Sequence, residues 1–130
     1  MSASRCFVPV PGYRKGSLRL SDGDRIPYLI LGDGPVPVIF IPGAGDGLRT
    51  VTDAALRLAF YFRKRLSNYR MLLLSRRQPI PRDFTVEQHA DDCLWATERL
   101  GWEPSLVECN SAGEPIGQWV ATKRQNWCEL

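Results

Sequence analysis

Three short apolar runs, each followed by a segment with helical spacing, most constrain how this chain can fold. The runs are VPVIFI (36–41), YRMLLL (69–74) and SLVEC (105–109). Runs of this kind, with little polar alternation, indicate strands that are buried on both faces, as in a parallel sheet. Because a helix follows each run, the order predicts the α/β class, a three-layer α/β/α fold with a mostly parallel sheet and right-handed crossovers.

The helices between the runs carry recognisable start and stop signals. Thr50 is expected to open the first helix, with Asp53 three residues later as its capping partner. Thr85 is expected to open the second, where Gln88 completes a capping box and Gly101 ends the helix. Phe84 and His89 occupy the two staple positions across the first turn of that second helix. Its expected apolar stripe is Val86, Ala90, Cys93, Leu94, Thr97 and Leu100.

Two further elements complete the expected order. Residues 17–31 contain two apolar runs around the turn signal Asp22-Gly23-Asp24, which predicts a hairpin. Residues 113–124 are expected to form a third helix. Its inward-facing residues are expected to be Ile116, Trp119 and Val120. The sequence contains no internal repeat and no linker, so we expect one domain over residues 1–130.

The charge balance argues against a nucleic-acid partner. The 130 residues include 17 Lys and Arg against 14 Asp and Glu, a net charge of +3, and 44% are hydrophobic. The basic clusters 63–65 and 76–77 are short and lack the interleaved aromatic residues of a base-stacking surface. We therefore interpret both clusters as solvated surface.

The sequence gives no sign of a membrane span, a secretion signal or a cofactor. No apolar run approaches the roughly 20 residues that cross a bilayer, and the N-terminus lacks a continuous apolar core. A cytoplasmic location is expected. The four cysteines, at 6, 93, 109 and 128, have no C-x-x-C spacing, so no metal site, redox pair or cofactor is expected. We interpret the cysteines as buried free thiols.

Small residues follow two of the expected strands, in the loops PGAGDG (42–47) and CNSAGE (109–114). Ligands bind at the carboxyl ends of strands in an open α/β sheet, so the two loops are expected to meet at one site. A serine on a sharp strand-to-helix turn becomes a nucleophile only when the residues two positions to either side are small. Cys109 and Gly113 meet this requirement around Ser111.

At this point the sequence resembles the α/β-hydrolase family over about residues 17–125. The resemblance is carried by VIFIPGAG (38–45), FTVEQHADD (84–92) and CNSAG (109–113) followed by PIGQWVA. It implies a single truncated α/β-hydrolase-like domain with carboxylic-ester-type hydrolysis as its ancestral chemistry. The substrate would be a small acyl or ester compound.

The resemblance also assigns roles to three residues. Ser111 matches the nucleophile, and the backbone amides of Ala44 and Ala112 match the two oxyanion donors. Such amides face the oxygen that becomes negative when an acyl carbon turns tetrahedral. The family commonly has small residues where Cys109 and Glu114 stand, and a carboxylate at Glu114 would oppose that negative charge if it faced the site.

A second interpretation of the same serine remains open. Ser111 to Glu114 is an S-x-x-E capping box, in which the hydroxyl accepts from the Glu114 amide and the carboxylate returns to the Ser111 amide. A third interpretation is an anion site at the 43–47 loop. That loop, however, lacks the lysine of a P-loop.

The family pattern leaves Ser111 without its partners in this sequence. A serine needs a histidine base and an orienting carboxylate, and the family places both after the nucleophile. Residues 112–130 contain no histidine. The only histidine, His89, is interpreted as a packing residue, and a triad of His89, Asp92 and Ser111 is disfavoured. The 130 residues are therefore expected to be inactive alone.

The same resemblance raises an alternative function. In the family the strand at 105–109 is central, whereas here it is expected to form an edge with unpaired N–H and C=O groups. Such an edge invites a second copy of the chain or a complementing chain. A non-catalytic interaction module that pairs through strand 105–109 is the alternative to a hydrolase.

Overall fold

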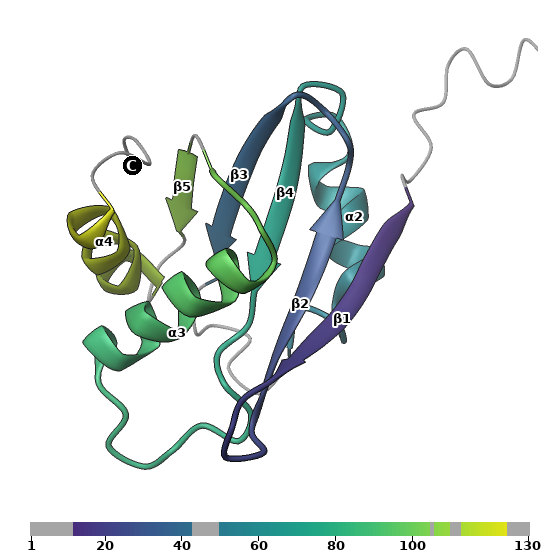
Figure 1. Cartoon of the computed structure of the whole chain (residues 1–130). Helices are drawn as coiled ribbons and strands as arrows, with labels where there is room; N and C mark the ends of the chain where they lie inside the picture. Colours follow the sequence, from purple (N-terminus) through teal and green to yellow (C-terminus); the bar gives the residue numbers. More distant parts are fainter. Residues whose placement is uncertain (1–11, 43–49, 105, 110–112, 125–130) are drawn as a thin grey trace, which may run out of the picture.

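The computed structural model describes residues 12–42, 50–104, 106–109 and 113–124. In this part of the chain five strands form one sheet in the order β1-β2-β4-β3-β5, accompanied by three helices (Figure 1). The elements are β1 (Tyr13–Arg19), β2 (Arg25–Leu31), β3 (Val36–Ile41), α2 (Ala55–Phe62), β4 (Tyr69–Leu74), α3 (Val86–Arg99), β5 (Leu106–Cys109) and α4 (Glu114–Lys123).

The sheet is mixed, with one strand opposed to the other four. β1 and β4 both pair antiparallel with β2, and β3 pairs parallel with β4 on one side and with β5 on the other. The arrows of β3, β4 and β5 accordingly point the same way in Figure 1. The expected mostly parallel sheet is confirmed, and the three strands predicted from apolar runs are its parallel part.

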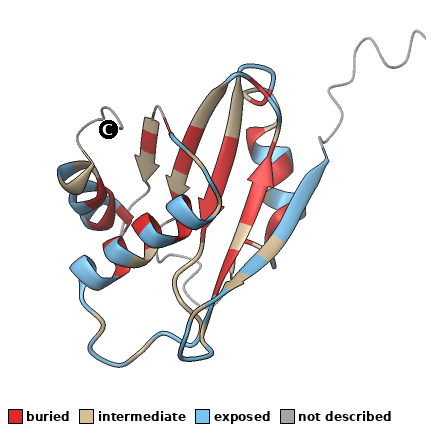
Figure 2. Ribbon diagram, in the orientation of Figure 1, coloured by how far each residue is buried: buried red, intermediate tan, exposed pale blue. Residues whose placement is uncertain are grey.

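Two cores confirm the three-layer arrangement, because α2 covers one face of the sheet and α3 and α4 cover the other (Figure 1). Side chains alternate between the faces along each strand. On β4, Leu72 and Leu74 join the core under α3 and α4, whereas Met71 and Leu73 join the core under α2. Burial on both faces explains why β4 has no polar alternation, and Figure 2 shows it buried along most of its length.

The β1–β2 hairpin forms as predicted, with β1 as an exposed edge. Its turn is stabilised by the Asp24 amide, which donates to the Asp22 carboxylate at 3.0 Å. Gly23 supplies the turn residue with a φ of +94°, which favours glycine. β1 is largely exposed and β2 largely buried (Figure 2).

Helix α3 confirms its predicted signals. Thr85 is the N-cap, and both hydrogen bonds of the capping box with Gln88 are present. The Phe84 and His89 rings meet edge to face with centroids 4.7 Å apart, as a staple requires. Gly101 follows the helix with a φ of +75°, the usual C-terminal stop. Val86 was wrongly expected inside; it lies at the exposed first position of the helix.

The other two helices differ in detail from the expectation. The Asp53 amide donates to the Thr50 hydroxyl at 3.3 Å, but residues 51–54 form turns and α2 begins at Ala55. In α4, Ile116 and Val120 are buried as predicted. Trp119 was wrongly placed inside; it is 41% exposed, because α4 packs on the sheet through a narrow stripe that includes Gly117.

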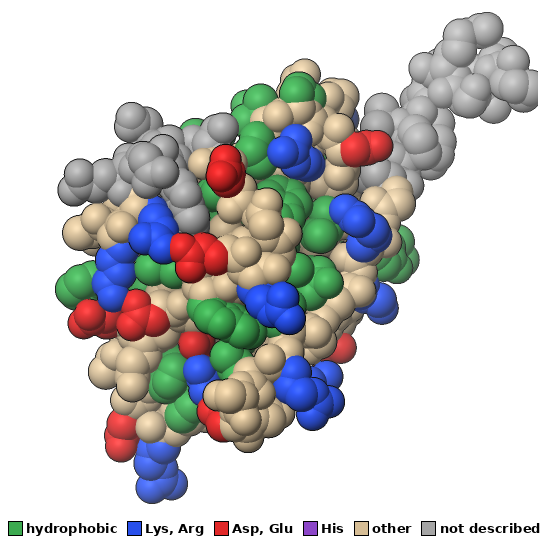
Figure 3. Space-filling view, viewed as in Figure 1, with side chains coloured by type: hydrophobic (Ala, Val, Ile, Leu, Met, Phe, Trp, Pro, Cys, Tyr) green, Lys and Arg blue, Asp and Glu red, His purple; other side chains and the backbone are tan. Residues whose placement is uncertain are grey.

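The interpretation of both basic clusters as solvated surface was wrong for Arg77 of the second cluster. Arg77 has a side chain only 15% exposed and bridges three carboxylates. Arg65 pairs with Glu108 of β5 at 2.7 Å. Acidic and basic side chains are interspersed on the face seen in Figure 3. Within the described ranges, no helix has the length and apolar character needed to cross a membrane.

Candidate functional site

The carboxyl edge of β3 and β5 is the place where the predicted site would lie. The two strands are hydrogen-bonded neighbours, and the last residue of each, Ile41 and Cys109, are register partners. The two strands therefore end side by side and at the same level of the sheet. Ser111, Ala112 and Ala44 themselves lie outside the described residues.

Gly113, at the start of α4, lies against the end of β3. A β-carbon added to Gly113 would fall 2.5 Å from the Ile41 carbonyl oxygen and 2.9 Å from that of Pro42. Both neighbours are backbone atoms, so they cannot turn aside as a flexible side chain could. The glycine is needed for space, not for its dihedral angles, because its φ of −78° suits any residue. This contact gives a physical reason for the small residue predicted two positions after Ser111.

Cys109, two residues before the predicted nucleophile Ser111, lies near the carboxylates of Glu114 and Glu108. Its thiol is half-buried. Burial raises the pKa of Cys109, and the carboxylates of Glu114 and Glu108 raise it further. The thiol is therefore protonated at neutral pH and is a poor nucleophile. The effect of Glu114 on Cys109 places a carboxylate near the end of β5.

The capping box predicted over Ser111 to Glu114 stays a prediction. The helix begins at Glu114 with Gly113 as N-cap, and no side chain donates or accepts at that cap. Gly113 already has helical dihedral angles, with a φ of −78° and a ψ of −15°, and α4 follows from Glu114. The Glu114 side chain is exposed, and Ser111 lies outside the described residues.

His89 is a packing residue, as its sequence context predicted. It is 9% exposed against Phe84, and burial lowers the pKa of its imidazole, as do the nearby Arg76 and Arg77 cations. Both carboxylate oxygens of Asp92 accept from Arg77, at 3.0 and 2.8 Å. Asp92 is thus held by an arginine, and within the described part of the chain it makes no hydrogen bond to His89.

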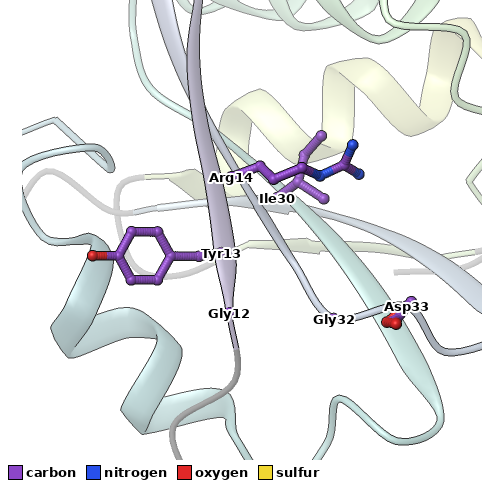
Figure 4. Close-up of a pocket in the computed structure, with 6 residues that line it drawn as sticks. All are labelled: Gly12, Tyr13, Arg14, Ile30, Gly32 and Asp33. Atoms are coloured by element: carbon purple, nitrogen blue, oxygen red, sulfur yellow. The ribbon is translucent and has the colours of Figure 1, made fainter.

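A separate hollow lies at the opposite edge of the sheet, near the start of β1 (Figure 4). Its volume is about 380 Å³. It is lined by residues from the start of β1 and the end of β2, namely Gly12, Tyr13, Arg14, Ile30, Gly32 and Asp33. In Figure 4 Tyr13 points away from Arg14 and Ile30. Because β1 runs in the same direction as β3, this hollow lies away from the carboxyl edge.

Across the described ranges, no three His, Cys, Asp or Glu side chains are grouped so that they could hold a metal ion. Cys93 is a buried free thiol, and burial raises its pKa to about 12. Cys6 and Cys128 lie outside the described residues.

Comparison with known proteins identifies the fold. No protein-family model matches the chain, and neither does any curated protein sequence. Solved structures do match. A putative epoxide hydrolase from Pseudomonas aeruginosa is similar with a TM-score of 0.68 and 21% identity, covering 90% of this chain and 39% of that one. An epoxide hydrolase from Vigna radiata has a TM-score of 0.67 and 14% identity, covering 91% and 38%.

These similarities show that the chain has the α/β-hydrolase fold, as its sequence pattern predicted. The Cif epoxide hydrolase from Acinetobacter nosocomialis agrees, with a TM-score of 0.65 and 14% identity over 89% of this chain. The chain spans 36% to 39% of the length of these three structures. The 130 residues therefore correspond to only part of each of these α/β-hydrolase-fold structures.

Two features of the carboxyl edge have no counterpart in the sequence analysis. The Val51 amide donates to the Ser75 hydroxyl at 2.7 Å, which joins the approach to α2 to the end of β4. Arg77 joins the hairpin turn to α3. Both contacts bridge segments far apart in sequence. The only sequence signal for either contact was the position of Ser75 directly after the apolar run 69–74.

Proposed function

We propose that this chain carries the nucleophile half of a serine hydrolase site for carboxylic esters. Ser111 would be the nucleophile, and the backbone amides of Ala44 and Ala112 would stabilise the oxyanion. The observation that carries the proposal is the junction of Ile41, Cys109 and Gly113, where the ends of two neighbouring strands and the start of α4 meet.

The proposal is supported by how this junction limits the path of the chain. Residues 110–112 have to connect the end of β5 to a helix whose first turn touches the end of β3. The proposal requires a sharp strand-to-helix turn at this connection, because that is the geometry that lifts a serine hydroxyl clear of the sheet. The amino end of α4 also favours negative charge at this place.

The chemistry of serine favours esters over epoxides. Attack of a serine oxygen on an ester carbonyl forms a tetrahedral oxyanion, expels an alcohol and leaves an acyl-enzyme that water can hydrolyse. Attack on an epoxide carbon would leave an ether, which water does not cleave under these conditions. The similar solved structures are epoxide hydrolases, but Ser111 supports acyl transfer for this chain.

These 130 residues are expected to turn over esters slowly at best. The sequence places no histidine after Ser111, and His89 is buried against Phe84. Without a base to remove its proton, a serine hydroxyl is a weak nucleophile. An oxyanion hole and binding alone nevertheless retain about 10³- to 10⁴-fold catalysis over water in serine hydrolases that lack triad members. A histidine and a carboxylate from additional sequence would complete the site.

A fluorophosphonate probe tests the proposal, because its phosphorus is far more electrophilic than an ester carbon. We expect slow covalent labelling of the folded protein at Ser111, located by peptide mass spectrometry. Ser111→Ala should abolish the labelling, whereas the control Ser105→Ala should leave it unchanged. Labelling that is absent from the folded wild-type protein, or that persists in Ser111→Ala, would overturn the proposal.

We propose as the second candidate a non-catalytic module that pairs through β5. Among the described strands β5 pairs with β3 alone, so its second edge carries backbone groups without a strand partner in that part of the chain. Outward-facing Leu56, Phe60 and Tyr61 on α2 are 62%, 51% and 75% exposed, so that face also has apolar surface for a partner. A second copy is the simplest partner.

Sedimentation velocity distinguishes the two candidates. If pairing through β5 is the function, the sedimentation coefficient should rise with concentration, and Val107→Pro should remove the rise by preventing a backbone ladder. Because proline could also disturb the β3–β5 pair, circular dichroism should accompany the measurement. A monomer over a hundredfold range of concentration would argue against self-pairing.

A further inference from the structure

The connection between β4 and α3 is attached to the rest of the fold by three sets of contacts. The Gln78 amide donates to the Arg25 carbonyl at 2.7 Å, and the Arg25 amide donates to the Gln78 carbonyl at 3.1 Å. The Arg77 guanidinium binds carboxylates of the hairpin turn and of α3. Phe84 packs against His89 in the first turn of α3. A few residues therefore hold the β4–α3 connection in place.

Phe84 contacts two side chains that can carry positive charge. Its ring meets the His89 imidazole edge to face, with centroids 4.7 Å apart. The Arg77 guanidinium lies over the same ring, 5.1 Å from its centroid. His89 is 9% exposed, so a charge on its imidazole would have little access to water. This packing therefore suits a neutral imidazole.

Three charged side chains act on the His89 imidazole, two from the β4–α3 connection and one from α3. Burial lowers the pKa of His89, the Arg76 and Arg77 cations lower it further, and the Asp92 carboxylate raises it. Both oxygens of Asp92 already accept from Arg77, at 3.0 and 2.8 Å. Protonation of His89 would therefore add a third positive charge beside two arginines, at a place with little water.

From this packing we infer that His89 is an acid-sensitive switch that controls whether the β4–α3 connection stays packed on α3. While the imidazole is neutral, Phe84 remains against it and the connection is closed. When the imidazole takes up a proton, the connection opens, because separation of Phe84 from His89 lets the charge reach water. The inference does not depend on the proposed hydrolase site or on pairing through β5.

Proton linkage sets the pH range of the switch. In the packed state the pKa of His89 lies below its ordinary value of 6.5, and in the open state it returns to that value. The open state therefore binds more protons between the two values. The packed state keeps its full stability above the ordinary value and loses it as the pH falls toward the lower one. The opening equilibrium constant rises by up to about tenfold for each pH unit in this range.

The experiment follows two NMR signals in the whole 130-residue protein. His89 is the only histidine, so a single imidazole signal reports its protonation. Hydrogen exchange of the Gln78 amide reports opening, because this amide is bonded to Arg25 in the closed connection. Between about pH 7.5 and pH 5, where carboxylates with ordinary values near 4 stay ionised, we expect the Gln78 protection factor to fall by about tenfold. The Leu72 amide, in the central strand β4, should remain better protected, because the sheet stays closed.

Two substitutions of His89 remove the titration. His89→Phe keeps a ring against Phe84 but cannot take up a proton, so its Gln78 protection factor should change by less than about twofold over the same range. His89→Leu serves the same purpose if His89→Phe fails to fold.

A matched pair of arginine substitutions tests the charge argument. Arg76→Gln removes one of the cations that act on His89, so it should raise the pKa of His89 toward the ordinary value and weaken the pH dependence of Gln78 exchange. Arg82→Gln, at an exposed position in the same connection and not among the charges that act on His89, should leave both signals unchanged.

Each outcome supports the switch or overturns it. Loss of Gln78 protection in acid that is present in wild type and absent from His89→Phe supports it. An equal loss in His89→Phe overturns it, because another group would then be responsible. Equal protection of Gln78 and Leu72 near pH 5 also overturns it, since acid would be opening the whole sheet. A His89 signal that titrates at or above the ordinary value has the same consequence.

Discussion

Gly113→Ala should destabilise the protein by about 1–3 kcal/mol, although alanine normally stabilises a position with this backbone conformation. At a negative φ, replacing glycine by alanine usually adds about 0.4–1 kcal/mol by restricting the unfolded chain. Here the new β-carbon would lie 2.5 Å from the Ile41 carbonyl oxygen, so β3 and α4 would have to separate. Such overpacking is expected to outweigh the entropic gain. Urea unfolding monitored by tryptophan fluorescence measures the difference.

Gly12→Ala is the matched control for this prediction. Gly12 does not have a positive φ, and in the described part of the chain no atom lies within 4 Å of an added β-carbon. We expect its stability to change by less than about 0.5 kcal/mol. If Gly113→Ala is as stable as wild type, the close approach of α4 to β3 is not a constraint. The junction that carries the proposed function would then lose its support.

Arg77→Ala should cost about 2–4 kcal/mol of unfolding free energy, through loss of a network that joins three segments. The guanidinium binds both oxygens of Asp92 on α3 and also pairs with Asp22 and Asp24 of the hairpin turn, at 2.9 and 3.5 Å. Its removal leaves Asp92, whose side chain is 13% exposed, without its partner. This range begins lower than the roughly 3–5 kcal/mol that breaking a fully buried pair costs, because Asp22 is exposed.

Two comparisons test whether the network is the cause. Arg82→Ala, at an exposed position in the same loop, should change stability by less than about 0.5 kcal/mol. Asp92→Asn should recover part of the loss when combined with Arg77→Ala, because it removes the unpaired charge. The prediction fails if Arg77→Ala and Arg82→Ala unfold at the same urea concentration, or if the double variant shows no coupling.

The sequence predicted the elements whose signals are local. The apolar runs at 36–41 and 69–74 became β3 and β4 with those bounds. The capping residues Thr85 and Gln88 located the start of α3 without any tertiary information. Alternation of helices with strands was sufficient to predict the fold class, because few topologies satisfy short right-handed crossovers.

Errors arose where packing, and not periodicity, decides which side of a helix is buried. Trp119 and Val86 have helical spacing but lie at the margins of their apolar stripes, and both are exposed. Residue type alone also gave no ion-pair partner for Arg65, which lies at the surface, or for Arg77, whose side chain is largely buried. Their partners, Glu108 and Asp92, are distant in sequence.

The sequence by itself determined the strands, the capped helices and the resemblance that makes Ser111 the candidate nucleophile, because these depend on residue type and near-neighbour spacing. Tertiary structure decided the features that depend on contact between distant segments. It placed Ile41 beside Cys109, set Gly113 against the end of β3 and gave the Val51 amide its acceptor in Ser75. No local pattern encodes these contacts, since each arises only when separate strands end at the same edge of one sheet.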